Sequence, residues 1–356
     1  MKPTVFFIPV HNAQDTGKLS ASFKLLLRKI PWKDIFPNNY IVAVKMHFGE
    51  KDNTGHIPAP IIKNLADKLK SSGIKPFITD TNVLYHGQRT NSVDHINLAR
   101  EHGYSLQTCG APVIIADGLF GENVFEIPFN GRHCRQLKTA GILKNLHGFV
   151  SAAHYTGHMV TGFGGTLKNI GMGFANRAGK QIQHSAIKPS VIEKSCTYCK
   201  KCIAVCPVQA IVAKNNNAFI NEQTCIGCAD CIVACQFKAI KITWEESFNN
   251  LEEKMVEYAA GIINHIPHTY FINFAVHITK ECDCLAKDDP SIVDDIGILA
   301  SRDPVALDKA TLDLVLKEAG KDIFKIHHPD TDYQRQLDYA SQIGLGSLEY
   351  KLEEIQ

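Results

Sequence analysis

Residues 40–50 read YIVAVKMHFGE, and this stretch begins the pattern that recurs along the chain. Its apolar run predicts a buried strand over 40–46, which ends in polar side chains. An amphipathic helix is predicted at 60–71, and a second strand at 76–79 ends in Asp80. Strands that alternate with helices of ten or more residues form βαβ units with parallel strands. The sequence therefore predicts an α/β protein with a mainly parallel sheet.

The alternation continues on both sides of this unit. Further strands are predicted at 6–10, 113–116, 269–276 and 296–300, and further helices at 20–30, 91–102, 252–264 and 304–320. Asp303 precedes Pro304 at the start of the last helix, so we expect this carboxylate to cap it. Because the pattern is interrupted and then returns, we predict one α/β domain in two parts, 1–185 and 246–356, around an insert at 186–245.

Composition and charge exclude several classes of protein. The 356 residues include 38 Lys and Arg against 36 Asp and Glu, a net charge of +2. This balance argues against a nucleic-acid-binding protein and against a polybasic membrane binder. No stretch approaches the roughly 18–20 apolar residues of a membrane-spanning helix, and the first apolar run is too short for a signal sequence. We therefore expect a cytoplasmic protein, in which cysteines hold metals more often than they form disulfides.

Eight of the twelve cysteines lie in the insert, in two runs of the same spacing. The first run is CTYCKKCIAVCP at 196–207, and the second is CIGCADCIVACQ at 225–236. In this bacterial ferredoxin spacing, three cysteines of one run and the last cysteine of the other hold one [4Fe–4S] cluster. Cluster I is thus expected on Cys196, Cys199, Cys202 and Cys235, and cluster II on Cys225, Cys228, Cys231 and Cys206.

Structural zinc is the alternative for paired Cys-x-x-Cys motifs. A zinc ion uses four thiolates, however, and would leave the doubling to eight unexplained. The matching sequences VQAI at 208–211 and FKAI at 237–240 predict that each run leads into a short strand. We therefore expect a small α+β domain of the dicluster ferredoxin type, which carries single electrons between two [4Fe–4S] clusters.

Basic residues outnumber acidic ones in the insert. The lysines are Lys194, Lys200, Lys201, Lys214, Lys238 and Lys241, against Glu193, Glu222, Asp230 and Glu245. The clusters themselves carry negative charge, so these lysines either neutralise it locally or dock an acidic redox partner protein.

The ends of the predicted strands carry candidate catalytic residues. Ligands of parallel α/β sheets bind outside the carboxyl ends of the strands, where Lys45, His47 and Asp80 are expected. Lys168 lies beside a glycine-rich stretch and is equally well placed for ligand binding. Aligned basic side chains would suit an anionic small-molecule substrate or cofactor, and His47 or His154 could relay protons. A solvated lysine is the alternative interpretation of Lys45.

The stretch 157–179 holds seven of the 25 glycines. Such density suggests backbone held at positive φ or lying close to a ligand. Neither the Walker spacing nor Gly-x-Gly-x-x-Gly occurs, so no nucleotide fingerprint is present and a generic anion-binding loop stays open. His154 and His158 have metal-ligand spacing if they lie on a helix, which Gly157 between them disfavours.

Four cysteines lie outside the insert. Cys282 and Cys284 would face the same side of a strand, where they could bind one metal ion or form a redox pair. Two unrelated cysteines are the alternative. Cys109 and Cys134 have no partner motif and are expected to be core thiols.

Several of these motifs occur together in one known family. They are KMHFGE at 45–50, TDTN at 79–82, LKNIGMG at 167–173, CDC at 282–284 and SRDPVALDK at 301–309. In this order they resemble the uncharacterised Fe–S center proteins built on domain of unknown function 362. The resemblance spans nearly the whole chain and departs from the usual ferredoxin pattern at Gln236, where proline is common. It implies an iron–sulfur protein with the ferredoxin module inserted, and it implies no particular reaction.

Three hypotheses about function follow. The leading one is a redox protein whose two clusters pass single electrons to or from a site at the strand ends. The second is a non-enzymatic carrier or accessory subunit that docks a larger oxidoreductase. The third is a metal-handling or maturation protein that uses Cys282 and Cys284 to hold an additional ion.

Overall fold

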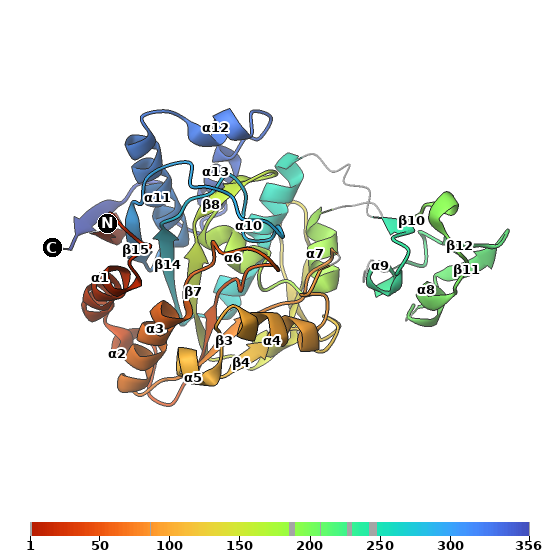
Figure 1. Ribbon diagram of the computed structural model, residues 1–356, viewed down its shortest axis with the longest axis horizontal. Coiled ribbons are helices and arrows are strands. Elements are labelled where there is room, and N and C mark those ends of the chain that lie inside the picture. The colour runs from red at the N-terminus through yellow and green to blue at the C-terminus, as the bar shows by residue number, and fades with distance from the viewer. Residues whose placement is uncertain are drawn as a thin grey trace.

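A computed structural model describes residues 2–85, 87–184, 189–206, 208–225, 230–241 and 248–355. The expected boundaries of the insert, near 185 and 245, lie outside the described residues. An eight-stranded sheet forms the centre of the main body (Figure 1). Its strands in spatial order are β16 (Lys351–Glu354), β1 (Thr4–Pro9), β15 (Gly297–Ser301), β14 (Thr269–Ala275), β7 (Gly148–His154), β2 (Ile41–Lys45), β3 (Lys75–Asp80) and β4 (Val113–Ile115).

The prediction of a mainly parallel α/β sheet is confirmed. β15 is antiparallel to both of its neighbours, β1 and β14, whereas the remaining pairs in the sheet are parallel. β14, which follows the insert in sequence, pairs with β7, which comes before the insert. In this pairing Asn273 lies opposite Ala153. The segments before and after the insert therefore share one sheet. As a result, the carboxyl ends of β14, β7, β2 and β3 lie at the same edge.

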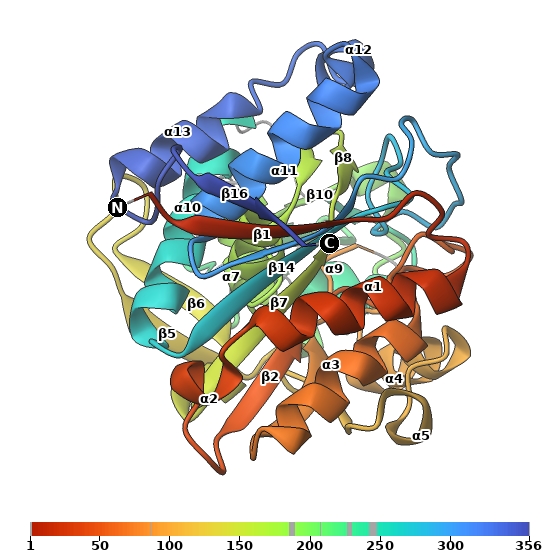
Figure 2. The same cartoon turned by 90° about the vertical axis from the view of Figure 1, so that its left-hand side faces the viewer.

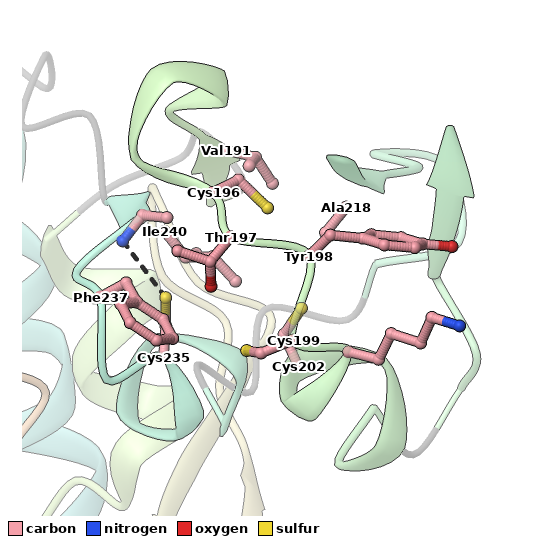
Figure 3. A pocket seen from close by; sticks show the side chains of 12 residues that line it. Val191, Cys196, Thr197, Tyr198, Cys199, Cys202, Ala218, Cys235, Phe237 and Ile240 are labelled. Atoms are coloured by element: carbon pink, nitrogen blue, oxygen red, sulfur yellow. Dashed lines mark hydrogen bonds between the residues drawn. The ribbon is translucent and has the colours of Figure 1, made fainter. Parts of the chain in front are cut away.

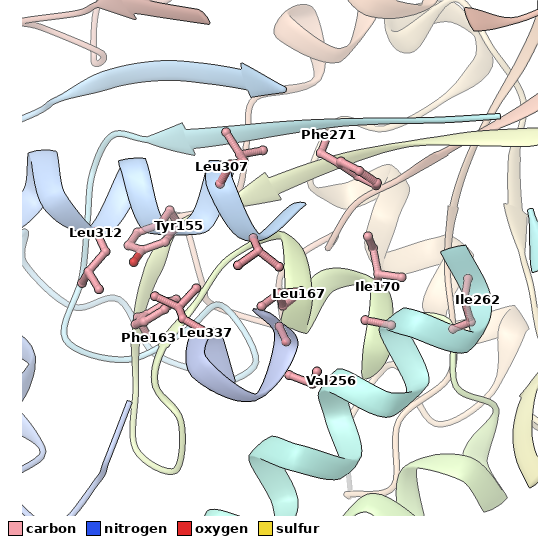
Figure 4. Close-up of a cluster of buried hydrophobic side chains, with 14 of the residues drawn as sticks. Tyr155, Phe163, Leu167, Ile170, Val256, Ile262, Phe271, Leu307, Leu312 and Leu337 are labelled. Atoms are coloured by element: carbon pink, nitrogen blue, oxygen red, sulfur yellow. The ribbon is translucent and has the colours of Figure 1, made fainter. Parts of the chain in front are cut away.

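Helices cover both faces of this sheet (Figure 2). One face carries α1 (Thr16–Lys29), α2 (Trp32–Ile35), α3 (Ala59–Ser71), α4 (Ser92–Glu101) and α5 (Leu106–Cys109). The other face carries α6 (Thr166–Gly171), α10 (Phe248–His265), α11 (Pro304–Ala319), α12 (Ile323–His327) and α13 (Gln334–Gln342), and α7 (Arg177–His184) packs against α10. Each face has its own apolar core. Figure 4 shows one of them, in which Leu167 and Ile170 of α6 meet Val256 of α10 and Leu307 of α11.

Local sequence explains the ends of two helices. In α3 the apolar residues recur at helical spacing, and Ile61, Leu65 and Leu69 are fully buried on one face. In α11 the side chain of Asp303 accepts hydrogen bonds from two backbone N–H groups of the first turn, at 2.9 and 2.8 Å. The predicted cap is confirmed. Asp303 thereby satisfies donors that a helix N-terminus otherwise leaves unpaired.

The glycine-rich stretch is not a positive-φ loop. It forms β8 (Thr156–His158), β9 (Gly162–Gly164), α6 and α7, and Gly162 alone among its seven glycines has a positive φ, of 67°. Close packing, rather than a positive φ, explains the other glycines of this stretch. A Cβ at Gly179 would lie 2.0 Å from the carbonyl oxygen of Lys138, and one at Gly171 would lie 2.1 Å from that of Met255. These glycines allow helices to approach neighbouring backbone.

β8 and β9 pair as one hairpin, and β5 (Val124–Pro128) pairs with β6 (Gln136–Ala140) as another, which precedes the short 3₁₀ helix η1 (Gly141–Lys144).

Within the described residues, no helix combines the length and the apolar content that crossing a membrane requires.

The insert is a small α+β unit to one side of the main sheet (Figure 1). Its elements are β10 (Ser190–Val191), η2 (Glu193–Ser195), α8 (Lys201–Ala204), β11 (Ile211–Lys214), β12 (Asn217–Ile220), α9 (Asp230–Ala234) and β13 (Ile240–Lys241). β10 pairs with β13 and β11 pairs with β12, both antiparallel. The predicted short strands after the two cysteine runs are thus present, beginning at Ile211 and Ile240.

Candidate functional site

Four cysteines of the insert line one pocket. Cys196, Cys199 and Cys202 of the first run face it together with Cys235 of the second run (Figure 3). Phe237 and Ile240 belong to its apolar wall. Cys202 and Cys235 are buried, whereas Cys199 is exposed. The fold therefore brings the last thiol of one run to the first three thiols of the other.

The loops around these cysteines adopt unusual backbone conformations. Tyr198 and Lys200 have φ of 54° and 61°, in the loop that joins the first three cysteines. Gln209 and Lys238 both have φ of 52°, each at the third position after the last cysteine of its run. Positive φ is uncommon for residues other than glycine and persists where the surrounding structure determines it, often at functional sites. The two runs therefore repeat one backbone geometry.

Hydrogen bonds to sulfur repeat in the same way. The backbone N–H of Ala210 donates to Cys206 Sγ at 3.2 Å, and that of Ala239 donates to Cys235 Sγ at the same distance. Such bonds stabilise negative charge on a ligand sulfur.

The second set of cysteines is described in part. Cys225, Cys231 and Cys206 belong to or pack against the insert's apolar core, and Cys228 lies outside the described residues. Leu84 of the main body, 4% exposed, belongs to this core as well. The loop after β3 therefore joins the main body to the insert.

At the carboxyl edge of the main sheet, Lys45 and Asp80 form a buried ion pair. Lys45 ends β2 and Asp80 ends β3, and Nζ lies 2.9 Å from Oδ1. The side chains are 1% and 4% exposed. Burial lowers the pKa of Lys45, and Asp80 partly offsets that effect. Lys45 Nζ also donates to Asn169 Oδ1 at 3.0 Å, so α6 contributes to the same group.

Arg89 connects several of these side chains. Its Nε lies 3.2 Å from Glu50 Oε2, and its Nη1 lies 2.7 Å from His47 Nε2 and 3.5 Å from Asp80 Oδ2. Its Nη2 donates to the hydroxyl of Tyr85. Arg89 is 1% exposed and stays charged. Sequence reasoning missed it because it lies in an irregular loop, at no strand end and in no motif.

Lys180 supplies a second buried ammonium group. Its Nζ donates to Thr81 Oγ1 and to the carbonyl oxygen of Asn82. The side chain of Asn82 in turn donates to Asp117 Oδ1 at 2.9 Å. Burial lowers the pKa of Lys180 and raises that of Asp117. The edge of the sheet thus holds three buried cationic side chains, Lys45, Arg89 and Lys180.

Cys282 and Cys284 lie in a turn rather than on a strand. The backbone N–H of Leu285 donates to the carbonyl oxygen of Cys282 at 3.2 Å, which closes a β-turn. Cys284 Sγ lies 3.4 Å from His47 Nε2 and 3.9 Å from Lys168 Nζ. The strand geometry considered from the sequence therefore does not occur, and the two thiols lie at the first and third positions of the turn.

His154 fixes this turn. Its Nδ1 lies 2.8 Å from Asp283 Oδ2, and its Nε2 lies 2.8 Å from the carbonyl oxygen of Val276. Burial disfavours the imidazolium, but Asp283 outweighs it and the pKa of His154 rises. His154 ends β7 and His158 ends β8, so the helical spacing expected for a metal pair does not occur. Among the described residues, no three His, Cys, Asp or Glu side chains are arranged to hold a metal ion.

The two thiols of the turn differ in acidity. The hydrogen bond from Cys284 is the largest cause that lowers the pKa of Cys282, and with Lys168 it outweighs burial and brings this pKa to about 6. The same hydrogen bond raises the pKa of Cys284. Burial disfavours the Lys168 ammonium, but the two thiols outweigh it and raise the pKa of Lys168. At neutral pH the turn therefore holds one thiolate and one thiol beside a cation.

The five candidate residues from the sequence thus lie in one connected network. They are Lys45, His47, Asp80, His154 and Lys168. The additional members are Arg89, Lys180 and the turn 282–285. Cys109 and Cys134 are buried, 0% and 4% exposed, as expected for core thiols.

Comparison with known proteins gives a family. Residues 42–313 match the family described as Domain of unknown function (DUF362). Comparison with curated proteins finds no match. Among solved structures, the chain is similar to the lactate racemase apoprotein from Thermoanaerobacterium thermosaccharolyticum, with 11% identity and a TM-score of 0.35, over 76% of this chain and 50% of that one.

It is also similar to a protein from Thermotoga maritima, with 12% identity and a TM-score of 0.45, over 91% of this chain and 59% of that one. The chain therefore spans about half to three fifths of the length of these two proteins. The family match, by contrast, covers most of the chain. The chain belongs to the family described as Domain of unknown function (DUF362).

Proposed function

We propose that this protein is an iron–sulfur redox protein whose two [4Fe–4S] clusters pass single electrons between a partner protein and the site at the strand ends. The observation that carries the proposal is the pocket shared by Cys196, Cys199, Cys202 and Cys235. Three thiols from one run and one from the other are the ligand set that the ferredoxin spacing requires.

The arrangement of the thiols supports a cluster over a single zinc ion. A zinc site needs ligand atoms that converge on one point at about 2.0–2.3 Å. A zinc ion also uses four thiolates and would leave the doubling of the cysteine motif unexplained. The four thiols instead surround a pocket, and Cys235 accepts a backbone N–H bond at 3.2 Å. A bound cluster would supply one-electron chemistry at this position, with its potential tuned by such hydrogen bonds.

A chain of contacts leads from the insert to the strand ends. Leu84 lies in the insert's apolar core, and the next residue, Tyr85, accepts a hydrogen bond from Arg89. Arg89 in turn contacts His47, which lies beside Cys284. Electrons from the insert therefore have a short route to the network of the main body.

The buried charges of the main body support a reactive site over a mere docking function. Burial of Lys45, Asp80 and Arg89 costs several kcal/mol per ion before their mutual attraction repays it. Buried charges of this kind cluster at functional sites, and an anionic small-molecule substrate is the ligand that the cationic side chains would suit.

The partner and the compartment are part of this proposal. Basic side chains remain on the surface of the insert, and Lys200 and Lys214 extend over the rings of Tyr198 and Phe219. An acidic redox protein is the partner that such a surface fits. Eight cysteines in cluster-ligand spacing fit a compartment in which thiols stay reduced, which supports the cytoplasm as the location.

Anaerobic reconstitution of the full chain tests the proposal. Two clusters correspond to about eight irons and eight sulfides per chain. Cys235→Ser removes one ligand of cluster I and should lower the iron content to about four, whereas Cys109→Ala, a buried thiol far from both runs in sequence, should leave it unchanged. Zinc in place of iron, or an unchanged iron content in the Cys235 variant, would refute the assignment.

A further inference from the structure

The turn at residues 282–285 carries a cysteine at its first position, Cys282, and another at its third, Cys284. In an extended chain, residues i and i+2 lie roughly 7 Å apart between Cα atoms, beyond the usual range of about 4.4–6.8 Å for a disulfide. The β-turn closed by Leu285 and Cys282 shortens this separation. Without the turn, the Cys-x-Cys spacing would strain the bond.

Two contacts hold the turn in place from outside. The backbone N–H of Glu50 donates to the carbonyl oxygen of Asp283 at 2.9 Å, and the side chain of Asp283 pairs with His154 at 2.8 Å. The central residue of the turn is thereby fixed at both its backbone and its side chain. Cys282 and Cys284 are left on either side of it, and Cys284 Sγ lies 3.9 Å from Lys168 Nζ.

We propose that Cys282 and Cys284 form a reversible dithiol–disulfide centre, which exchanges two electrons with the clusters one at a time. This inference rests on the proposed function, because the clusters are its electron donors and acceptors. In the oxidative direction the S–S bond forms from the Cys282 thiolate and the Cys284 thiol. Two electrons leave singly, one to each oxidised cluster, and one proton leaves the Cys284 sulfur. In the reductive direction, two electrons and that proton restore the thiolate and the thiol.

The surroundings match each part of this step. Lys168 stabilises the thiolate that reacts, and a thiolate is the form that attacks sulfur. His47 Nε2, 3.4 Å from Cys284 Sγ, is placed to take the proton. Each cluster accepts one electron, and the dithiol releases two. Two clusters can therefore accept all the electrons of one dithiol, which would explain why the cluster motif is doubled.

The first experiment examines the thiols of the full chain without its clusters. The protein is equilibrated in glutathione buffers of increasing oxidation, alkylated and digested. We expect a peptide with an internal Cys282–Cys284 disulfide, absent from Cys282→Ser and present in Cys109→Ala. Two alkylated thiols at 282 and 284 in buffers that oxidise dithiols in general would refute the centre.

The second experiment tests the link to the clusters. Reconstituted wild type and Cys282→Ser, matched in iron content, are oxidised and then titrated anaerobically with dithionite. Wild type should take up about two electrons more per chain, since one disulfide requires two. Equal uptake at equal iron would refute the coupling while the cluster assignment stands. A disulfide in a chain that binds no iron would support the dithiol centre and refute the iron–sulfur assignment instead.

Discussion

His47 Nε2 and Cys284 Sγ lie 3.4 Å apart, although 237 positions separate the two residues in sequence. His47 lies two residues after the end of β2, and Cys284 lies in the loop that follows β14. The two strands are separated by β7 alone, and all three run in the same direction. The parallel sheet therefore places both loops at one edge, where a thiol, an imidazole and the guanidinium of Arg89 meet.

The buried pair of Lys45 and Asp80 should dominate the stability of the sheet edge. Lys45→Met leaves Asp80 buried without its closest counter-charge, so we expect a loss of about 3–5 kcal/mol in the free energy of unfolding. Adding Asp80→Asn should recover part of this loss, because the uncompensated charge is then gone. Urea denaturation of the single and double variants measures both effects.

An exposed pair on α3 serves as the control. Lys63 and Asp67 are 45% and 49% exposed, and Lys63→Met should change stability by less than about 1 kcal/mol. Equal losses for Lys45→Met and Lys63→Met would show that burial does not strengthen the first pair.

Cys284 should control the acidity of Cys282 by its hydrogen bond. The alkylation rate of Cys282 should rise with pH around a midpoint near 6, because the thiolate is the reactive form. Cys284→Ala removes the hydrogen-bond donor and should shift the midpoint upward, toward the ordinary thiol value. Cys284→Ser keeps a donor and should shift it less. The alkylation rate of the Cys282 peptide is followed by mass spectrometry. Equal midpoints for Cys284→Ala and Cys284→Ser would contradict this account.

The pair of His154 and Asp283 should make stability depend on pH. The pKa of His154 is raised above 6.5, so its contribution is fully present below that value and is lost as pH rises through the folded-state pKa. The pKa of Asp283 is depressed, because His154 outweighs the effect of burial, so its contribution is present above 3.8 and falls at lower pH. The pair should therefore stabilise the fold most between these two values.

His154→Asn tests this dependence. The difference in unfolding free energy between wild type and variant should be larger at pH 6 than at pH 9, as measured by urea denaturation at both values. A difference that does not change with pH would show that His154 is neutral in the folded protein.

Gly173 should tolerate no side chain. A Cβ there would lie 2.1 Å from the carbonyl oxygen of Asn169 and 2.5 Å from Lys45 Nζ. Gly173→Ala should therefore cost about 1–3 kcal/mol and displace Lys45 from Asp80. Gly17→Ala, in the first turn of α1, meets a single side-chain atom at 3.1 Å and should be neutral or stabilising by up to about 1 kcal/mol. Thermal unfolding of the two variants compares them directly.

Local pattern determined most of the elements of this protein. The helix predicted at 60–71 is α3, Ala59–Ser71, and the strand predicted at 269–276 is β14, Thr269–Ala275. Periodicity succeeds here because it reports which face of an element is buried, and that is a local property. It did not reveal β7, whose sequence GFVSAAH mixes small and polar residues. Both faces of this strand are buried in the middle of the sheet, so its sequence does not alternate between apolar and polar residues.

The cysteine spacing likewise determined which thiols to expect together, since ligand spacing is local to each run. Such local patterns could not predict the order of the strands in the sheet. Lys45 and Asp80 were candidates because they end predicted strands, and His154 because it could relay protons, but strand pairing over more than a hundred residues put them in one network. Arg89 and the turn at 282–285 belong to irregular loops, which have no periodicity to read. Their place in the site was decided by the tertiary structure, because long-range packing and buried charge pairing fix such loops.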